Sequence, residues 1–151
     1  MLIIKHTVAT DATPAQVWHV WQDVTTWNSW DHTLEASAID GSFTAGTPGT
    51  LKFKDGTELK TVLTHVDSGT SFVQEAKLFL AKTIMSHYLH EVDGKTYVTV
   101  QTDIKGPLAF VYRLFIGRSI KKKVPLEVEA MLKKAKDYSP SFISSLINRF
   151  L

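Results

Sequence analysis

The feature that most constrains the fold is a run of short β-type segments between residues 34 and 105. Turn signals such as Asp40-Gly41 and Asp93-Gly94 divide this run into pieces of six to eleven residues that are rich in β-branched and aromatic side chains. Short strands joined by tight turns are typical of an antiparallel sheet in which sequence neighbours are also spatial neighbours. The pattern predicts six strands, at residues 34–40, 49–54, 58–66, 70–79, 82–92 and 95–105.

The residues before this run add one strand and two short helical pieces. The alternation and β-branched content of residues 2–10 predict a first strand. Thr13 directly before Pro14 is a helix N-cap signal, because a capping hydroxyl and a proline at the first helical position both favour helix initiation. A short helix is therefore predicted over residues 14–22, with a second brief helix or turn near residues 24–30.

The residues after the run are predicted to form a long helix and a tail. Beyond Gly106-Pro107 the apolar residues recur at helical spacing and form one stripe, made of Val124, Val128, Met131, Leu132 and Ala135. We expect Pro125 to kink or restart this helix, because proline lacks the N–H of a regular turn. The sequence thus predicts one domain over residues 1–138 and a separate amphipathic tail helix over residues 139–151.

Composition excludes several classes of protein. The chain has 151 residues, of which 44% are hydrophobic and 21% charged, as in a single globular domain. It has no cysteine, which excludes disulfides, thiolate metal sites and cysteine nucleophiles. No run approaches the roughly 18 apolar residues of a membrane-spanning helix, and the first apolar stretch is too short for a signal peptide. We therefore expect a soluble, cytoplasmic protein.

Positive charge is concentrated in one segment. Residues 1–112 carry eight basic and twelve acidic side chains, whereas residues 113–136 carry eight basic and two acidic ones. Such a segment attracts nucleic acid or an anionic membrane surface, but lysine is also the usual way to solvate a helix face, and we favour the solvated face. Tyr97 has no second aromatic residue at strand spacing with which to form a base-stacking platform. We therefore expect no nucleic-acid partner, and we disfavour peripheral membrane contact.

Known catalytic and metal-binding motifs are missing from the sequence. His87 and His90 are three residues apart on a predicted strand, so their side chains point to opposite faces and cannot hold one ion. There is no Gly-x-Ser-x-Gly elbow, and the glycine-rich stretch at residues 41–47 lacks the lysine of a phosphate-binding loop. We expect no metal site and no cofactor.

An internal cavity follows from the predicted architecture. A curved sheet covered by one long helix leaves its concave side less densely filled than two packed sheets do, and such cavities are common ligand sites. The same apolar residues can also simply pack against one another, and this alternative stays open. The residues that we predict to line the cavity are Trp27, Trp30, Phe53, Phe72, Met85, Leu89, Tyr112 and Phe115.

Three segments together resemble a known superfamily. The segment 11–30 begins Asp-Ala-Thr-Pro and continues with tryptophans at positions 18, 21, 27 and 30. It resembles the opening of the START-like or Bet v 1-like (SRPBCC) superfamily, especially the polyketide cyclase/dehydrase and lipid-transport branch. The segment 89–99, Leu-His-Glu-Val-Asp-Gly-Lys-Thr-Tyr-Val-Thr, is similar to the penultimate hairpin of that family. Gly106-Pro107-Leu-Ala and the lysine-rich stretch after it are similar to its C-terminal helix.

This resemblance covers residues 2–136 and implies an α+β helix-grip fold. In that fold a seven-stranded curved antiparallel sheet wraps around a long C-terminal helix, with two short helices after the first strand, and an apolar pocket is enclosed. Trp27 and Trp30 match tryptophans near the pocket entrance of the family. The residues that the implied hairpin points inward are Met85, His87, Leu89, Val98, Val100 and Thr102.

His87 is the only candidate for chemistry that the resemblance suggests. A buried imidazole can orient a ligand carbonyl or act as an acid or base, or it can merely bond to a neighbour or a buried water. Cyclase members of the family often place arginine in the pocket, whereas the three arginines of this chain, Arg113, Arg118 and Arg149, all lie outside the predicted sheet.

Our leading hypothesis is a non-enzymatic carrier or sensor of a small hydrophobic ligand such as a lipid, a polyketide-like molecule or an aromatic compound. One alternative is a cyclase or dehydratase-type lyase that uses His87. Another is a protein-interaction module acting through the tail helix, and a homodimer also stays open.

Overall fold

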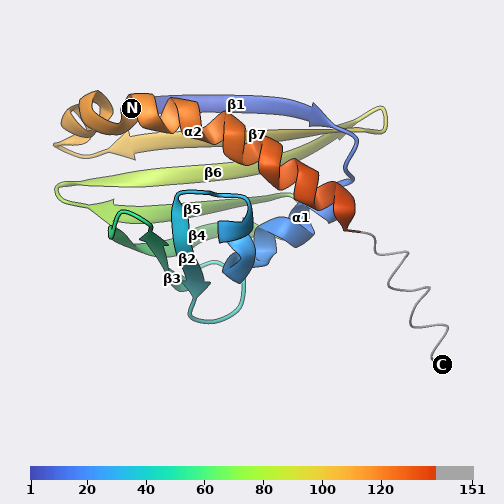
Figure 1. Ribbon diagram of the computed structural model, residues 1–151, viewed down its shortest axis with the longest axis horizontal. Helices are drawn as coiled ribbons and strands as arrows, with labels where there is room; N and C mark the ends of the chain where they lie inside the picture. Colours follow the sequence, from blue (N-terminus) through green and yellow to red (C-terminus); the bar gives the residue numbers. More distant parts are fainter. Residues whose placement is uncertain (139–151) are drawn as a thin grey trace.

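The computed structural model describes residues 1–138 and contains one antiparallel sheet with a long helix lying across it (Figure 1). The strand order in the seven-stranded sheet is β1-β7-β6-β5-β4-β3-β2. The elements, in chain order, are β1 (Leu2–Thr10), α1 (Pro14–Gln22), the 3-10 helix η1 (Val24–Ser29), β2 (Leu34–Ile39), β3 (Pro48–Phe53), β4 (Glu58–Asp67), β5 (Ser71–Leu78), β6 (Ala81–Val92), β7 (Lys95–Lys105) and α2 (Ala109–Asp137).

The sheet is a meander to which the first strand returns at the far edge. Strands β2 to β6 each pair with the next one in the chain. β1 pairs with β7, with Thr10 opposite Thr96 and Leu2 opposite Asp103. The predicted helix-grip fold is confirmed, with all seven strands and both short helical pieces. The predicted tail helix at residues 139–151 lies outside the described residues.

Helix α1 begins where the sequence predicts it. The backbone N–H of Gln16 donates to Thr13 Oγ1 at 3.2 Å, and the backbone N–H of Thr13 donates to Gln16 Oε1 at 2.8 Å. This reciprocal capping box satisfies two backbone donors that the first turn leaves free. The helix buries Val17, Trp18, Val20 and Trp21 against the sheet.

Helix α2 runs unbroken through Pro125, so the predicted restart at this residue is wrong. The physical reason is the burial that follows the proline, because the predicted stripe of residues 124–135 packs into the core and holds the next turns in helical register.

The end of α2 is held against α1. Gln16 Nε2 donates to the Tyr138 carbonyl at 2.6 Å, and the Tyr138 ring stacks on His19 with centroids 3.6 Å apart.

An aromatic cluster forms the centre of the core. Phe72 of β5 is 1% exposed, and its ring lies 5.1 Å from Phe43, 5.5 Å from Trp21 and 6.2 Å from both Trp18 and Trp27. Contacts at these separations, most of them edge-to-face, stabilise a core beyond simple area burial. The cluster fills the space between the sheet and the helices near α1.

Candidate functional site

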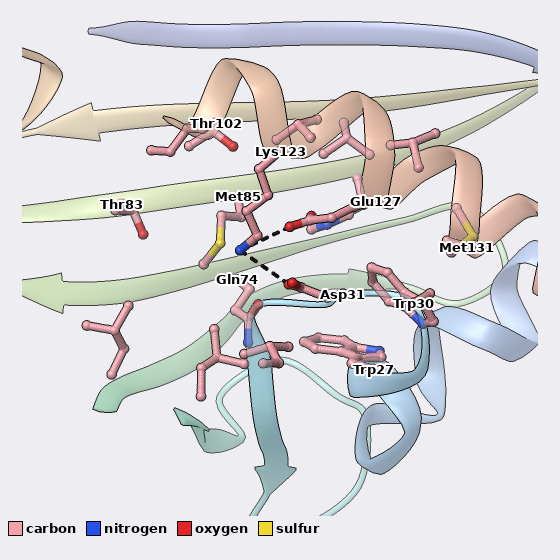
Figure 2. Close-up of a pocket in the computed structure, with 18 of the residues that line it drawn as sticks. Trp27, Trp30, Asp31, Gln74, Thr83, Met85, Thr102, Lys123, Glu127 and Met131 are labelled. Carbon is pink, nitrogen blue, oxygen red and sulfur yellow. Dashed lines mark ion pairs between the residues drawn. The ribbon is translucent and has the colours of Figure 1, made fainter. Parts of the chain in front are cut away.

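A cavity of about 250 Å³ lies between the concave face of the sheet and α2 (Figure 2). Its floor comes from β3 to β7, its roof from the middle of α2, and one end from α1, η1 and the turn that follows η1. Most of the lining side chains are apolar. The polar ones are Asp31, Gln74, Thr83, His87, Thr102, Lys123 and Glu127.

Seven of the eleven residues predicted to bind a ligand line this cavity. They converge from five different elements and the turn after η1, so the tertiary fold brings them together rather than any local motif. Thr102, predicted to point inward beside them, lines it as well. The seven are Trp27, Trp30, Phe53, Phe72, Met85, His87 and Val100.

The other four predicted residues lie elsewhere. Leu89 and Val98 face each other across β6 and β7 and are buried in the core, at a point where the packed side chains leave no cavity. Tyr112 donates its hydroxyl to the Phe79 carbonyl at 3.1 Å instead. Phe115 is 80% exposed, because it sits one residue, or about 100° of helical rotation, before Ile116, which does line the cavity.

His87 is held in the cavity wall by aromatic rings. Its imidazole stacks on Phe72 with centroids 4.0 Å apart and rings nearly parallel, and the edge of Trp21 approaches at 5.4 Å. Burial lowers the pKa of His87 to about 4, since the charged form loses its hydration there. The imidazole is therefore neutral near pH 7, and its buried Nδ1 has no hydrogen-bond partner.

Three ionisable side chains meet at the roof of the cavity. Lys123 Nζ lies 3.3 Å from Asp31 Oδ2 and 3.0 Å from Glu127 Oε1 (Figure 2). Lys123 and Glu127 are one turn apart on α2, whereas Asp31 belongs to the turn after η1. The Asp31 carboxylate is oriented by Thr33, whose backbone N–H and hydroxyl donate to Oδ1 at 3.0 Å and 2.7 Å.

Glu127 is the most perturbed group of this cluster. Burial raises its pKa to about 8, the Lys123 ammonium opposes that shift, and the Asp31 carboxylate adds to it. The side chain is largely protonated near pH 7 and forms a neutral acid beside a lysine–aspartate ion pair. Its Oε1 has no hydrogen-bond partner, although Lys123 Nζ lies 3.0 Å away in an ion pair. Such a carboxyl group can donate a hydrogen bond to a ligand or exchange a proton near neutral pH.

The sequence reasoning missed this cluster, although part of its signal was present. Glu127 falls inside the apolar stripe, between Val124 and Val128, and Lys123 precedes it by four residues, the spacing of an ion pair on one helix face. An acidic residue within an apolar stripe is a marker of a buried polar site. The approach of Asp31 has no comparable signal, because it depends on how the turn after η1 meets α2.

Unpartnered polar atoms coincide with this cavity. Within residues 1–138, four buried side-chain nitrogen or oxygen atoms lack a hydrogen-bond partner, and all four belong to residues that line the cavity. Unsatisfied buried polar groups are costly and rare in folded proteins, so their concentration in one place calls for an explanation. The four atoms are Trp30 Nε1, Thr83 Oγ1, His87 Nδ1 and Glu127 Oε1.

The carboxylates and histidines do not gather as metal ligands. Within residues 1–138, no group of three or more histidine, aspartate or glutamate side chains is arranged so that it can hold a metal ion.

A curved seven-stranded sheet that grips one long helix over an internal cavity defines the Bet v 1-like helix-grip class. The chain belongs to the family described as polyketide cyclase / dehydrase and lipid transport, which matches residues 1–139. The search of curated proteins returned no match.

Solved structures share this fold at low sequence identity. The Zhui aromatase/cyclase from Streptomyces sp. R1128 superposes with a TM-score of 0.75 at 13% identity, covering 88% of this chain and 92% of that one. Norcoclaurine synthase from Thalictrum flavum gives 0.68 at 14% identity, covering 89% and 86%. Ara h 8.0201 gives 0.69 at 13% identity, covering 89% and 97%. At these identities the likeness establishes the fold.

Proposed function

We propose that the protein binds a small amphiphilic molecule in the cavity and acts as its carrier or sensor. The observation that carries this proposal is the coincidence of an apolar cavity with three buried polar atoms on its walls that lack a hydrogen-bond partner, those of Trp30, Thr83 and His87, beside the Glu127 carboxyl group. A ligand with an apolar body and two or more hydroxyl or carbonyl groups removes the cost of those atoms while it buries its own apolar surface. A pure hydrocarbon leaves them unsatisfied.

The size of the cavity narrows the ligand class. An apolar cavity of about 150 Å³ accommodates benzene. At about 250 Å³, this cavity suits a molecule of one or two rings, or an aliphatic fragment of similar bulk. A solved structure of similar fold, norcoclaurine synthase from Thalictrum flavum, is in complex with dopamine and hydroxybenzaldehyde, which are single-ring compounds with polar substituents.

The test measures binding of 2,7-dihydroxynaphthalene, a two-ring probe with two hydroxyl groups, by isothermal titration calorimetry. Wild type is expected to bind one equivalent saturably. Met85→Trp places a bulky indole ring inside the cavity. This substitution is expected to weaken binding by at least about tenfold, since the ligand loses most of its apolar contact.

Tyr88→Trp is the matched control, because it adds a tryptophan to the exposed face of the same strand. It is expected to leave the affinity unchanged. Thermal unfolding of both variants checks that they remain folded. Undiminished binding by a folded Met85→Trp variant contradicts the proposal, as does the absence of saturable binding by wild type.

A second candidate function is a cyclase or dehydratase-type lyase with Glu127 as its acid–base group. The raised pKa of Glu127, about 8, favours this role, because an acid–base catalyst works best with a pKa near the operating pH. The lowered pKa of His87, about 4, suits it poorly to proton transfer near neutral pH. Turnover of a poly-β-keto thioester by wild type, lost in Glu127→Gln, is the expected result. No turnover by wild type removes this candidate.

A further inference from the structure

Large apolar side chains are exposed together at one end of the molecule. They belong to the β5–β6 turn and to the first two turns of α2, which lie at the same end of the sheet (Figure 1). Phe79 is 74% exposed and Phe115 is 80% exposed. We call this surface the apolar tip, and its members are Phe79, Leu80, Phe110, Leu114 and Phe115.

The two parts of the apolar tip are joined by hydrogen bonds. The backbone N–H of Leu108 donates to the Leu80 carbonyl at 3.1 Å, and the Tyr112 hydroxyl donates to the Phe79 carbonyl at 3.1 Å. The turn and the start of α2 are therefore held side by side. Several exposed apolar side chains gathered at one end of a molecule are of the kind that mark an interaction site.

The β5–β6 turn is chemically unusual. Its two residues are Phe79 and Leu80, and Leu80 has a φ of 51°, in the left-handed region that favours glycine and asparagine. The β6–β7 turn, made of Asp93 and Gly94, has the polar and flexible residues that such a position normally carries. The backbone conformation of this turn therefore does not explain why position 80 carries an exposed leucine.

Positive charge lies directly behind the apolar tip. From Lys105 to Leu126, with both ends included, the chain has six basic residues and no acidic one. Phe110, Leu114, Arg118 and Lys122 follow one another at intervals of four residues, so they form one stripe along α2. At 1.5 Å per residue, Arg118 lies about 6 Å and Lys122 about 12 Å behind Leu114 along the helix axis.

We propose that the apolar tip docks onto the surface of an anionic lipid bilayer. An interfacial helix buries its apolar side chains about 5–10 Å into the headgroup and acyl boundary and leaves its basic side chains with the anionic headgroups. When the apolar tip enters the bilayer end-on to this depth, Arg118, about 6 Å behind Leu114 along the helix axis, lies at the level of the headgroups. No helix within residues 1–138 is long and apolar enough to cross a membrane, and the proposed contact is peripheral.

Charge favours a bilayer over a second copy of the chain as the partner. Two copies that meet through the apolar tip bring two basic stripes together, with no carboxylate between residues 105 and 126 to compensate. An anionic bilayer neutralises the same stripe. The solvated helix face expected from the sequence explains the basic residues alone, but not the exposed phenylalanines beside them.

The apolar tip adjoins one end of the cavity. Leu78 and Ile116 line the cavity. Phe79 of the apolar tip directly follows Leu78 in the sequence, and Phe115 of the apolar tip directly precedes Ile116. Docking brings that end of the cavity to the membrane surface. The docking proposal does not depend on cavity occupancy, because its test uses vesicles without any added ligand.

The test is vesicle flotation of the full chain, with phosphatidylcholine vesicles compared with vesicles of phosphatidylcholine mixed equally with phosphatidylglycerol. Wild type is expected to float with the anionic vesicles alone. Leu114→Ser is expected to lower the partition coefficient by about tenfold, because one leucine no longer enters the apolar boundary.

Leu126→Ser is the matched control. Leu126 lies on the same helix with an exposed fraction of 65%, against 66% for Leu114, but outside the apolar tip. Its substitution is expected to leave flotation unchanged. Leu80→Asn is expected to reduce flotation while keeping or raising the melting temperature, since asparagine tolerates the left-handed backbone. Added salt is expected to weaken wild-type binding.

Three outcomes overturn the proposal. The first is equal flotation of wild type with neutral and anionic vesicles, or none with either. The second is equal loss of flotation in Leu114→Ser and Leu126→Ser. The third is a concentration-dependent dimer, seen by light scattering, that Leu114→Ser converts to monomer, because the apolar tip is then an interface between two copies of the chain.

Discussion

The two halves of α2 are both rich in apolar residues, but the second half buries most of its large ones, whereas the first half leaves most of its large ones exposed. After Pro125, Val128, Met131 and Leu132 are almost completely inaccessible, whereas Leu114 and Phe115 in the first half face solvent. The two halves differ in exposure because the second half packs against α1 and the aromatic cluster. An apolar helix residue therefore indicates the core only where another element covers it.

The comparison is tested most strongly by making the same substitution in each half. Leu132→Ala is expected to lower the free energy of unfolding by about 3.5 kcal/mol, because it leaves a void in a packed core. Leu114→Ala is expected to change it by less than about 0.5 kcal/mol, as is usual for an exposed site. Urea unfolding followed by circular dichroism measures both. Equal losses contradict the contrast between the halves.

The ionisation of Glu127 offers a second test, at the boundary between the two halves. Its pKa is raised from 4.5 to about 8 in the folded state, so the unfolded chain loses this proton first as the pH rises. The folded state is therefore destabilised progressively above about pH 4.5, by about 3 kcal/mol between about pH 5 and about pH 8. Glu127→Gln is expected to remove this loss, as measured by urea unfolding at several pH values.

His87 supplies the internal control for the pH series. Its pKa is lowered from 6.5 to about 4, so it destabilises the fold as the pH falls below about 6.5, in the opposite direction to Glu127. The difference between wild type and Glu127→Gln at each pH cancels this contribution. A difference that does not vary with pH contradicts the raised pKa of Glu127.

The smallest expected effect concerns Pro125, where the two halves join. Proline in a helix interior costs about 3 kcal/mol, because it removes one backbone hydrogen bond and its ring crowds the preceding turn. Pro125→Ala is expected to recover about 1 kcal/mol of this, measured by the same urea titration. A loss of stability instead shows that the roof of the cavity depends on the shape that proline imposes.

The fold was predictable from local signals, whereas the site was predictable only in part. Turn residues and alternation indicated every strand, and Thr13 with Pro14 indicated the start of α1, because these signals act within a few residues. The hairpin implied by the family resemblance also pointed Met85 and His87 inward, and both line the cavity. The prediction for Phe115 was wrong because a one-residue error in helix phase rotates a side chain by about 100°.

The charged cluster and the apolar tip show why the remaining features escaped prediction. Asp31 meets Lys123 across 92 residues of sequence, and no local pattern encodes that distance. The exposure of Phe79 could not be predicted from the sequence either, because apolar residues at the end of a strand are usually part of the core. Tertiary arrangement decides both, by bringing one pair of elements together and leaving another surface uncovered.

The crowding around Phe72 has a consequence for how this cavity can change during evolution. A substitution of Phe72 disturbs at least four neighbouring aromatic rings at once, so we expect single substitutions in that wall to cost stability before they alter ligand preference. Ile116 and Ile120 line the opposite wall from the less covered half of α2. New specificities are therefore expected to arise on the helix, while the aromatic wall is inherited unchanged.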